Sequence, residues 1–211
     1  MGLGILLPLT VNTVADMARW SARTVLATFI ILSVSYWASV GYATPAGPPE
    51  PELRNRLIAA INQSNSFEDR FHAEVWLLDM SYRLQKRIPD ANERLELLRT
   101  VHQEATQAGL PPEMVLALIQ VESNFKQYAI SSAGAQGLMQ IMPFWLDEIG
   151  RPGDNLFHIR TNLRMGCTIL RYYLDKSDGD RTKALARYNG SAGKTWYPNR
   201  VYKALRTSWR R

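Results

Sequence analysis

The chain of 211 residues is long enough for one domain of ordinary size plus an extension, and its 46% hydrophobic and 21% charged residues exclude a wholly disordered chain. The 25 Lys and Arg residues outnumber the 19 Asp and Glu residues, which gives a net charge of +6. A single cysteine, Cys167, excludes an intramolecular disulfide framework, and the three histidines lie far apart and outside any HExxH pattern. We therefore expect no metal site and no cofactor.

The N-terminal segment has the pattern of an export signal. Arg19 and Arg23 precede an uncharged, strongly apolar stretch, which ends in small residues that resemble a cleavage site near Ala43. We predict a signal peptide over residues 1–43, in which Met17 is a candidate for the true start. The alternative is a retained membrane anchor, because the apolar stretch is just long enough to cross a bilayer. Both interpretations place the rest of the chain outside the cytoplasm, in the periplasm or secreted.

A helical extension is predicted to follow a proline-rich linker. The linker covers residues 44–52 and the extension residues 53–92. Ser66, with Asp69 three residues on, predicts the start of a helix that Pro89 ends. The apolar residues expected to form one stripe on this helix are Phe67, Phe71, Val75, Leu78 and Tyr82.

The next segment predicts a second amphipathic helix. Asp90 and Glu93 give an N-terminal capping pattern, and Gly109 fits the position just after the C-terminal end. No strand-length alternation of period two occurs along the chain, so the fold class is predicted to be all-α. The residues expected on the buried face of this second helix are Leu95, Leu98, Val101 and Ala105.

Glu122 is the most informative residue of the sequence. The pair Pro111-Pro112 opens a helix, and the eight residues from Met114 onward are apolar nearly all round, which predicts a buried helix. Glu122 follows directly. Burial and the partial negative charge of a helix C-terminus would both raise its pKa from about 4.3, as a general acid near neutral pH requires. An exposed Glu on a fraying helix end is the alternative.

Two later segments supply polar groups suited to a sugar. Residues 131–143 form a loop rich in small residues that is predicted to run into a short apolar helix ending at Pro143. Gly134 and Gly137 allow close approach of the backbone, and Gln140 offers both a donor and an acceptor. Tyr188 and Asn189, at a predicted helix end, add a hydroxyl and an amide.

Together, three motifs resemble the catalytic domain of the soluble-lytic-transglycosylase (SLT) type, a branch of the lysozyme-like glycosidases. The motifs are Glu122-Ser, the run Gly137-Leu-Met-Gln-Ile-Met-Pro and Tyr188-Asn, in the order of the family. The resemblance covers residues 93–206, implies a lysozyme-like helical domain there, and leaves residues 207–211 as a basic tail.

The resemblance also implies the site residues. Glu122 corresponds to the catalytic acid and base, with the Tyr188 hydroxyl near its carboxylate. This chain reads Tyr-Asn-Gly where the family commonly reads Tyr-Asn-Ala-Gly-Pro, so the turn after Asn189 differs. The residues implied to bind substrate are Ser131, Gly137, Met139, Gln140, Tyr188 and Asn189.

The absence of a nearby second carboxylate indicates the chemistry. Residues 123–146 contain no Asp or Glu, whereas most glycosidases use two carboxylates. One carboxyl group suffices when the acetamido group of the substrate stabilises the developing cation. We therefore expect a peptidoglycan lytic transglycosylase that cleaves between N-acetylmuramic acid and N-acetylglucosamine and leaves 1,6-anhydro ends.

Two other functions remain open from the sequence. A goose-type-like lysozyme would share the fold and the acid but release hydrated products. A non-catalytic cell-wall-binding module would bind peptidoglycan without cleaving it. The expected partner is the glycan strand of peptidoglycan, whose carboxylates suit a basic protein. We expect no nucleic acid, a monomer, and membrane contact only if the N-terminal segment is retained.

Overall fold

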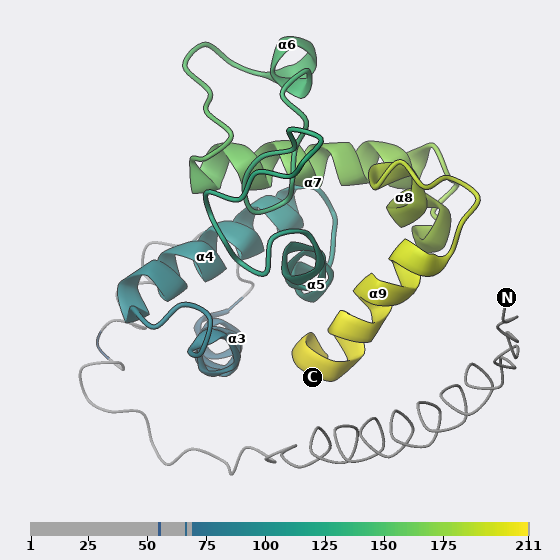
Figure 1. Cartoon of the computed structure of the whole chain (residues 1–211). Coiled ribbons are helices and arrows are strands. Elements are labelled where there is room, and N and C mark those ends of the chain that lie inside the picture. The colour runs from purple at the N-terminus through teal and green to yellow at the C-terminus, as the bar shows by residue number, and fades with distance from the viewer. Residues whose placement is uncertain (1–54, 56–65, 67–68, 211) are drawn as a thin grey trace, which may run out of the picture. The chain divides into compact units, whose positions relative to one another are not determined.

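The computed structural model describes residues 55, 66 and 69–210 (Figure 1). The chain divides into two compact units, residues 1–48 and 49–211, and every helix described below belongs to the second. The predicted signal peptide and the proline-rich linker lie outside the described residues. No helix in the described part of the chain is both long and apolar enough to cross a bilayer.

The described part of the chain is helical, which confirms the all-α prediction. It contains no β-strand; its extended pairing is limited to two isolated bridges, Ile130–Gln136 and Gln136–Ile141. The elements are α3 (Arg70–Leu84), α4 (Ala91–Gln107), α5 (Pro112–Glu122), α6 (Trp145–Ile149), α7 (Ile159–Asp175), α8 (Arg181–Tyr188), α9 (Trp196–Ala204) and the π-helix η1 (Leu205–Trp209).

Side-chain caps fix where the helices begin. Asp90 accepts hydrogen bonds from the backbone N–H groups of Asn92 and Glu93, so α4 starts where the sequence predicts. Gly109 follows this helix at φ 63°, as expected of a residue after a helix end. The start of α3 differs from the prediction: Asp69, rather than Ser66, caps it by accepting from the N–H of His72.

Most of the apolar stripe predicted on α3 is exposed, although Leu78 packs partly against the core and Phe67 lies outside the described residues. Phe71 is 72% exposed, and Val75 and Tyr82 are exposed as well. The buried face of α3 lies about half a turn away around the helix, because α3 packs against α4 and η1 on that side. The residues that form this buried face are Ala73, Trp76, Leu77, Met80 and Leu84.

Helix α5 is the centre of the packing. It contacts α4, α9 and η1, while α7 packs against α4 and α8. Figure 1 shows α5 end-on, with α4, α7 and α9 around it. All four residues expected on the inner face of α4 (Leu95, Leu98, Val101 and Ala105) are buried, as predicted.

Most of the predicted basic tail, residues 207–211, belongs to a helix instead. Residues 207–209 belong to η1, and Trp209 is 0% exposed. Its indole Nε1 donates to Oε1 of Gln120 on α5 at 2.8 Å. A buried tryptophan with a satisfied N–H contributes strongly to a core, so the C-terminal segment is part of the helical fold.

Candidate active site

The candidate catalytic carboxyl group lies at the last residue of the buried helix. Residues 114–119 of α5 are buried, and Glu122 ends the helix with a partly buried side chain. Burial raises the pKa of Glu122 from 4.5 to about 7, whereas a hydrogen bond from Tyr197 and the positive charge of Arg200 lower it. A carboxyl group with its pKa near neutrality keeps a protonated fraction there, as a proton donor working at that pH needs.

Tyr197, rather than Tyr188, is the direct partner of the acid. Tyr197 is the second residue of α9, is 1% exposed, and donates a hydrogen bond from its hydroxyl to Oε1 of Glu122. Burial and the nearby Glu122 raise the pKa of Tyr197 well above its ordinary value, so the phenol stays protonated as a donor. The sequence distance of 75 residues hides this contact from any local pattern.

Tyr188 does not hydrogen-bond to the Glu122 carboxyl group but lies close enough to feel its charge. Its hydroxyl donates to the carbonyl oxygen of Met139 at 2.8 Å. Burial, followed by the charge of Glu122, raises the pKa of Tyr188, so the two side chains interact electrostatically without a hydrogen bond between them. The hydrogen bond of Tyr188 joins the end of α8 to the Gly137–Gln140 segment.

In the described part of the chain, no second carboxylate contributes to the pKa of Glu122. The groups that shift it, besides burial itself, are one tyrosine and one arginine. Asp147 and Glu148 are exposed on α6. Asp154 is bound by Arg164 at 2.5 Å. The site thus offers a single acid and base.

Residues 137–140 form a turn, not the short apolar helix that the sequence predicts. An antiparallel bridge between Gln136 and Ile141 closes this turn. Gln140 has φ 51° and Gly137 has φ 78°, both in the left-handed region that an α-helix excludes. The apolar run misled the prediction because its side chains are buried by tertiary packing rather than along one helix face.

Asn162 on α7 holds this turn in place, and the sequence analysis missed it. Its Oδ1 accepts from the N–H of Met139 at 2.8 Å, and its Nδ2 donates to the carbonyl oxygens of Gln136 at 3.0 Å and Leu156 at 2.8 Å. A Cβ on Gly137 would lie 2.2 Å from this Nδ2, so only glycine fits there. A polar residue on the otherwise apolar inner face of α7 was the signal for it.

The other residues implied to bind substrate divide into framework and surface groups. The Met139 side chain is fully buried, so it cannot face a groove. Ser131 accepts from the N–H of Ala135 at 3.0 Å and braces its own loop. Gln140 donates hydrogen bonds from Nε2 to the carbonyl oxygens of Ala129 and Gly137, which leaves its Oε1 available. Asn189 is the exposed C-cap residue of α8.

Comparison with known families identifies this arrangement. The sequence profile described as "Transglycosylase SLT domain" matches residues 99–208, which is more than half of the chain. The chain belongs to the SLT-domain transglycosylase family. The resemblance found in the three motifs is thereby confirmed.

Similar proteins include two curated transglycosylases. The transglycosylase of Enterobacteria phage PRD1 is 30% identical over 117 residues, which cover 53% of this chain and 43% of the phage protein. Membrane-bound lytic murein transglycosylase C of Histophilus somni strain 2336 is 32% identical over 143 residues, covering 52% of this chain and 39% of that protein. The chain thus spans less than half the length of these relatives.

Solved structures include an inactive mutant of lytic transglycosylase Slt from Pseudomonas aeruginosa. It is 30% identical, with a TM-score of 0.42, and the similarity covers 57% of this chain and 19% of that one. The 70 kDa soluble lytic transglycosylase of Escherichia coli is 21% identical, with a TM-score of 0.42, and covers 70% of this chain and 26% of that one.

In this SLT domain, the backbone turns sharply just after Glu122. Asn124 and Phe125 have φ 49° and 67°, so two successive non-glycine residues adopt the left-handed conformation. Arg87, which follows α3, donates from Nε to Oδ1 of Asn124 at 3.0 Å. Its guanidinium also lies 5.9 Å from the ring centroids of both Phe125 and Trp209.

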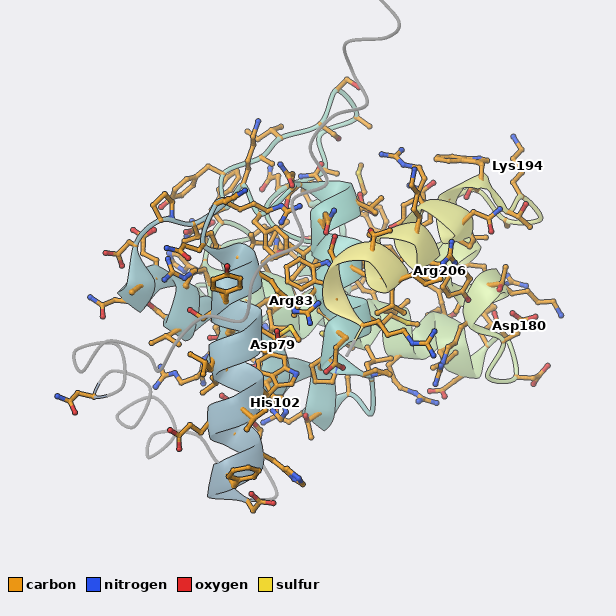
Figure 2. The ribbon with its side chains drawn as sticks, turned by 90° about the horizontal axis from the view of Figure 1, so that it is seen from below. Asp79, Arg83, His102, Asp180, Lys194 and Arg206 are labelled. Carbon is orange, nitrogen blue, oxygen red and sulfur yellow. The ribbon has the colours of Figure 1, made fainter. Side chains whose placement is uncertain are left out.

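Segments outside the matched SLT range therefore support the end of α5 that carries Glu122. Figure 2 shows Arg83 beside Asp79 on α3, and the two form an ion pair at 2.7 Å. Arg83 Nη1 also donates to the carbonyl oxygen of Ser208 in η1 at 2.9 Å. Helix α3 is thus joined to η1, and Arg87 just after it to the turn that follows Glu122, contacts that motif matching could not reveal.

Proposed function

We propose that this protein is a peptidoglycan lytic transglycosylase in which Glu122 is both the acid and the base. The observation that carries the proposal is a carboxyl group at the end of a buried helix, with a pKa raised to about 7 and no second carboxylate among the described groups that shift it. Membership of the SLT family and the names of its relatives support the same activity and substrate.

In this proposal, the two carboxyl oxygens of Glu122 have different tasks. Oε1 accepts the hydrogen bond from Tyr197, so Oε2 carries the proton that is transferred. Glu122 protonates the oxygen between N-acetylmuramic acid and N-acetylglucosamine, the bond from that oxygen to the muramic C1 breaks, and the glucosamine leaves with a free hydroxyl. The Tyr197 hydroxyl then stabilises the carboxylate that remains.

The second half of the reaction returns the proton to Glu122. The acetamido oxygen of the muramic residue stabilises the cation at C1. The carboxylate takes the proton from the 6-hydroxyl of the same sugar, and O6 bonds to C1 as the acetamido oxygen leaves. The product is a 1,6-anhydro sugar, and no water is consumed.

The substrate-binding roles are part of the same proposal. The Oε1 atom of Gln140, the Tyr188 ring and the Asn189 amide are the groups that we assign to contact with the glycan. Ser131, Gly137 and Met139 position them through the loop and the turn described above. The SLT domain over residues 93–206 would carry the activity, and residues 70–92 would support it.

We also propose that the protein works in the cell envelope. The names of its membrane-bound relatives support this location, and the export pattern of residues 1–43 supplies a route. Cleavage of that segment would place the protein in the periplasm or outside the cell, and retention would anchor it to the inner membrane.

Mass spectrometry of digested peptidoglycan tests the proposal. We expect fragments one water lighter than those that a muramidase releases from the same material. Hydrated fragments with reducing ends would identify a lysozyme instead. Binding to the insoluble material without release of fragments would identify a wall-binding module.

A further inference from the structure

The positive charge of the chain is concentrated at its C-terminal end. Residues 181–211 contain nine Lys and Arg residues and no Asp or Glu. The other 180 residues contain 16 Lys and Arg residues and all 19 Asp and Glu residues, so their net charge is −3. Such an asymmetry between two parts of a chain indicates attraction to a polyanionic partner.

Four of these cations share the exposed side of α9 and η1, which we call the basic face. The other side of both elements packs against α5. Arg206, one member of the basic face, is labelled in Figure 2. The four cations are exposed, follow one another at intervals of three or four residues, and are Arg200, Lys203, Arg206 and Arg210.

The cations of the basic face have no counter-charge within the described part of the chain. No hydrogen bond or ion pair joins any of the four side chains to another described residue. By contrast, Lys183 on α8 pairs with Asp180, and Arg164 on α7 pairs with Asp154. A typical soluble surface mixes charges of both signs, so a face that carries only cations is suited to binding anions.

An exposed tryptophan lies on the same face. Trp196 is the first residue of α9, is 49% exposed, and precedes Arg200 by about one helical turn. Its ring meets the ring of Tyr197 edge-on, with 5.9 Å between the centroids. Tryptophan is enriched where proteins meet the headgroup region of a bilayer, because its ring is apolar and its N–H is polar. The basic face therefore combines the two kinds of side chain that bind an anionic membrane surface.

We propose that the basic face docks the protein on an anionic phospholipid bilayer. Its four cations contact lipid phosphates, and the Trp196 indole enters the headgroup region. The convex side of a helix suits a broad, flat surface of this kind, whereas a single polyanionic strand is typically held in a groove. The inference rests on the proposed location in the cell envelope and not on the proposed reaction.

Docking by the basic face would bring the Glu122 end of the domain close to the bilayer. Arg200 follows Tyr197 by three residues on α9, and the Tyr197 hydroxyl binds Glu122. The basic face therefore borders the candidate active site, and the docked protein would present its acid beside the membrane.

A fluorescent label within the basic face tests the docking in the full chain. It is attached to Asn199→Cys, because Asn199 is exposed between Trp196 and Arg200, whereas the native Cys167 is 1% exposed and protected from the reagent. The chain is mixed with vesicles that carry a headgroup quencher, made of phosphatidylcholine with or without phosphatidylglycerol. We expect strong quenching only with phosphatidylglycerol, and loss of this quenching at high salt. A label at Thr106→Cys, exposed on α4, should be quenched much less.

The variant Lys203→Gln/Arg206→Gln tests the cations directly. Each Lys or Arg near an anionic bilayer strengthens binding about fivefold, so the ratio of quenched to unquenched Asn199→Cys chain at a fixed lipid concentration should fall about 25-fold. Arg151→Gln/Arg160→Gln is the matched control, because it removes two exposed cations from the loop before α7 and from its first turn. The control should keep the ratio of the wild type to within about twofold.

Three results would overturn the proposal. Equal quenching by both kinds of vesicle in the wild type would show that anionic lipid is not recognised. An equal fall in the two double variants would show that only net charge matters. If Lys203→Gln/Arg206→Gln weakens binding to insoluble peptidoglycan but not quenching by the vesicles, the basic face binds the wall instead. None of these measurements requires cleavage, so the membrane site and the proposed reaction can fail independently.

Discussion

Glu122 and Glu104 are two buried carboxyl groups whose surroundings suit them to different tasks. Burial raises the pKa of each. Glu122 ends a helix beside a tyrosine hydroxyl, and its pKa reaches about 7. Glu104 lies within α4 among three arginines, which counteract the effect of burial. The comparison teaches that burial is the main cause of the rise in pKa at both groups, and that the groups opposing it differ: a tyrosine hydroxyl and one arginine at Glu122, and three arginines at Glu104.

Glu122→Gln should have the largest effect. It keeps the size of the side chain and removes the transferable proton, so we expect cleavage of peptidoglycan to fall by about 10²- to 10⁴-fold, the range for a general acid. Release of soluble fragments measures the loss, and circular dichroism checks that the helices are retained. Near-normal activity in a folded variant would show that another group is the acid.

The same substitution should stabilise the fold at alkaline pH. The folded pKa of Glu122, about 7, lies above the ordinary 4.5, so the folded protein binds more protons between these values and loses stability as pH rises through that window. At pH 8 Glu122→Gln should therefore raise the free energy of unfolding by at most about 3 kcal/mol relative to pH 4.

Glu104→Gln provides the comparison for this stability effect. Its stabilisation at pH 8 relative to pH 4 should have the same sign and be smaller, because the arginines counteract burial at Glu104. Urea denaturation at both pH values measures each effect. An equal or larger gain for Glu104→Gln would contradict the distinction between the two carboxyl groups.

Tyr197→Phe should lower activity and move its pH dependence. Loss of a hydrogen bond to a charged group costs about 1.5 kcal/mol or more, so we expect about a tenfold lower kcat. The hydroxyl of Tyr197 lowers the pKa of Glu122, so its removal should shift the alkaline limb of the rate profile to higher pH. Tyr172→Phe, on an exposed part of α7, is the control and should leave that limb in place. An unshifted limb in Tyr197→Phe would argue against the hydrogen bond.

Arg87→Ala should have the smallest effect on activity. It removes the hydrogen bond to Asn124 and the contacts with Phe125 and Trp209, which hold the turn after Glu122. We expect kcat to fall by about threefold, the equivalent of a partly exposed hydrogen bond, with KM unchanged. Lys86→Ala, at the exposed neighbouring position, is the matched control. A change in KM alone would place Arg87 in substrate binding instead.

Local sequence patterns predicted the helices, and the place of Glu122 at the end of a buried helix, because their causes are local. Caps at Asp90 and Gly109 depend on a few neighbouring residues. The run after Pro112 is apolar nearly all round, so its burial can be predicted without knowing which face packs against the core. Glu122 could be found because it directly follows that run. The family motifs then indicated the segments that we propose to bind the glycan.

Long-range packing accounts for what the sequence did not predict. Helix α3 carries two apolar stripes, and its contacts with α4 and η1 decide which is buried. The turn at Gly137 is set by Asn162, and the partner of Glu122 is Tyr197, which lies 75 residues away. Each of these depends on a contact between segments distant in the sequence. Helix periodicity and capping patterns involve only neighbouring residues, so they do not predict such contacts.

The pKa of the Glu122 carboxyl group is the most direct test of the account. A ¹³C NMR titration of labelled glutamate side chains, with Glu122→Gln to assign the resonance, measures it in the full chain. We predict a midpoint near 7. A midpoint near the ordinary 4.5 would mean that the group is ionised at neutral pH, and the single-carboxyl mechanism would lose its proton donor.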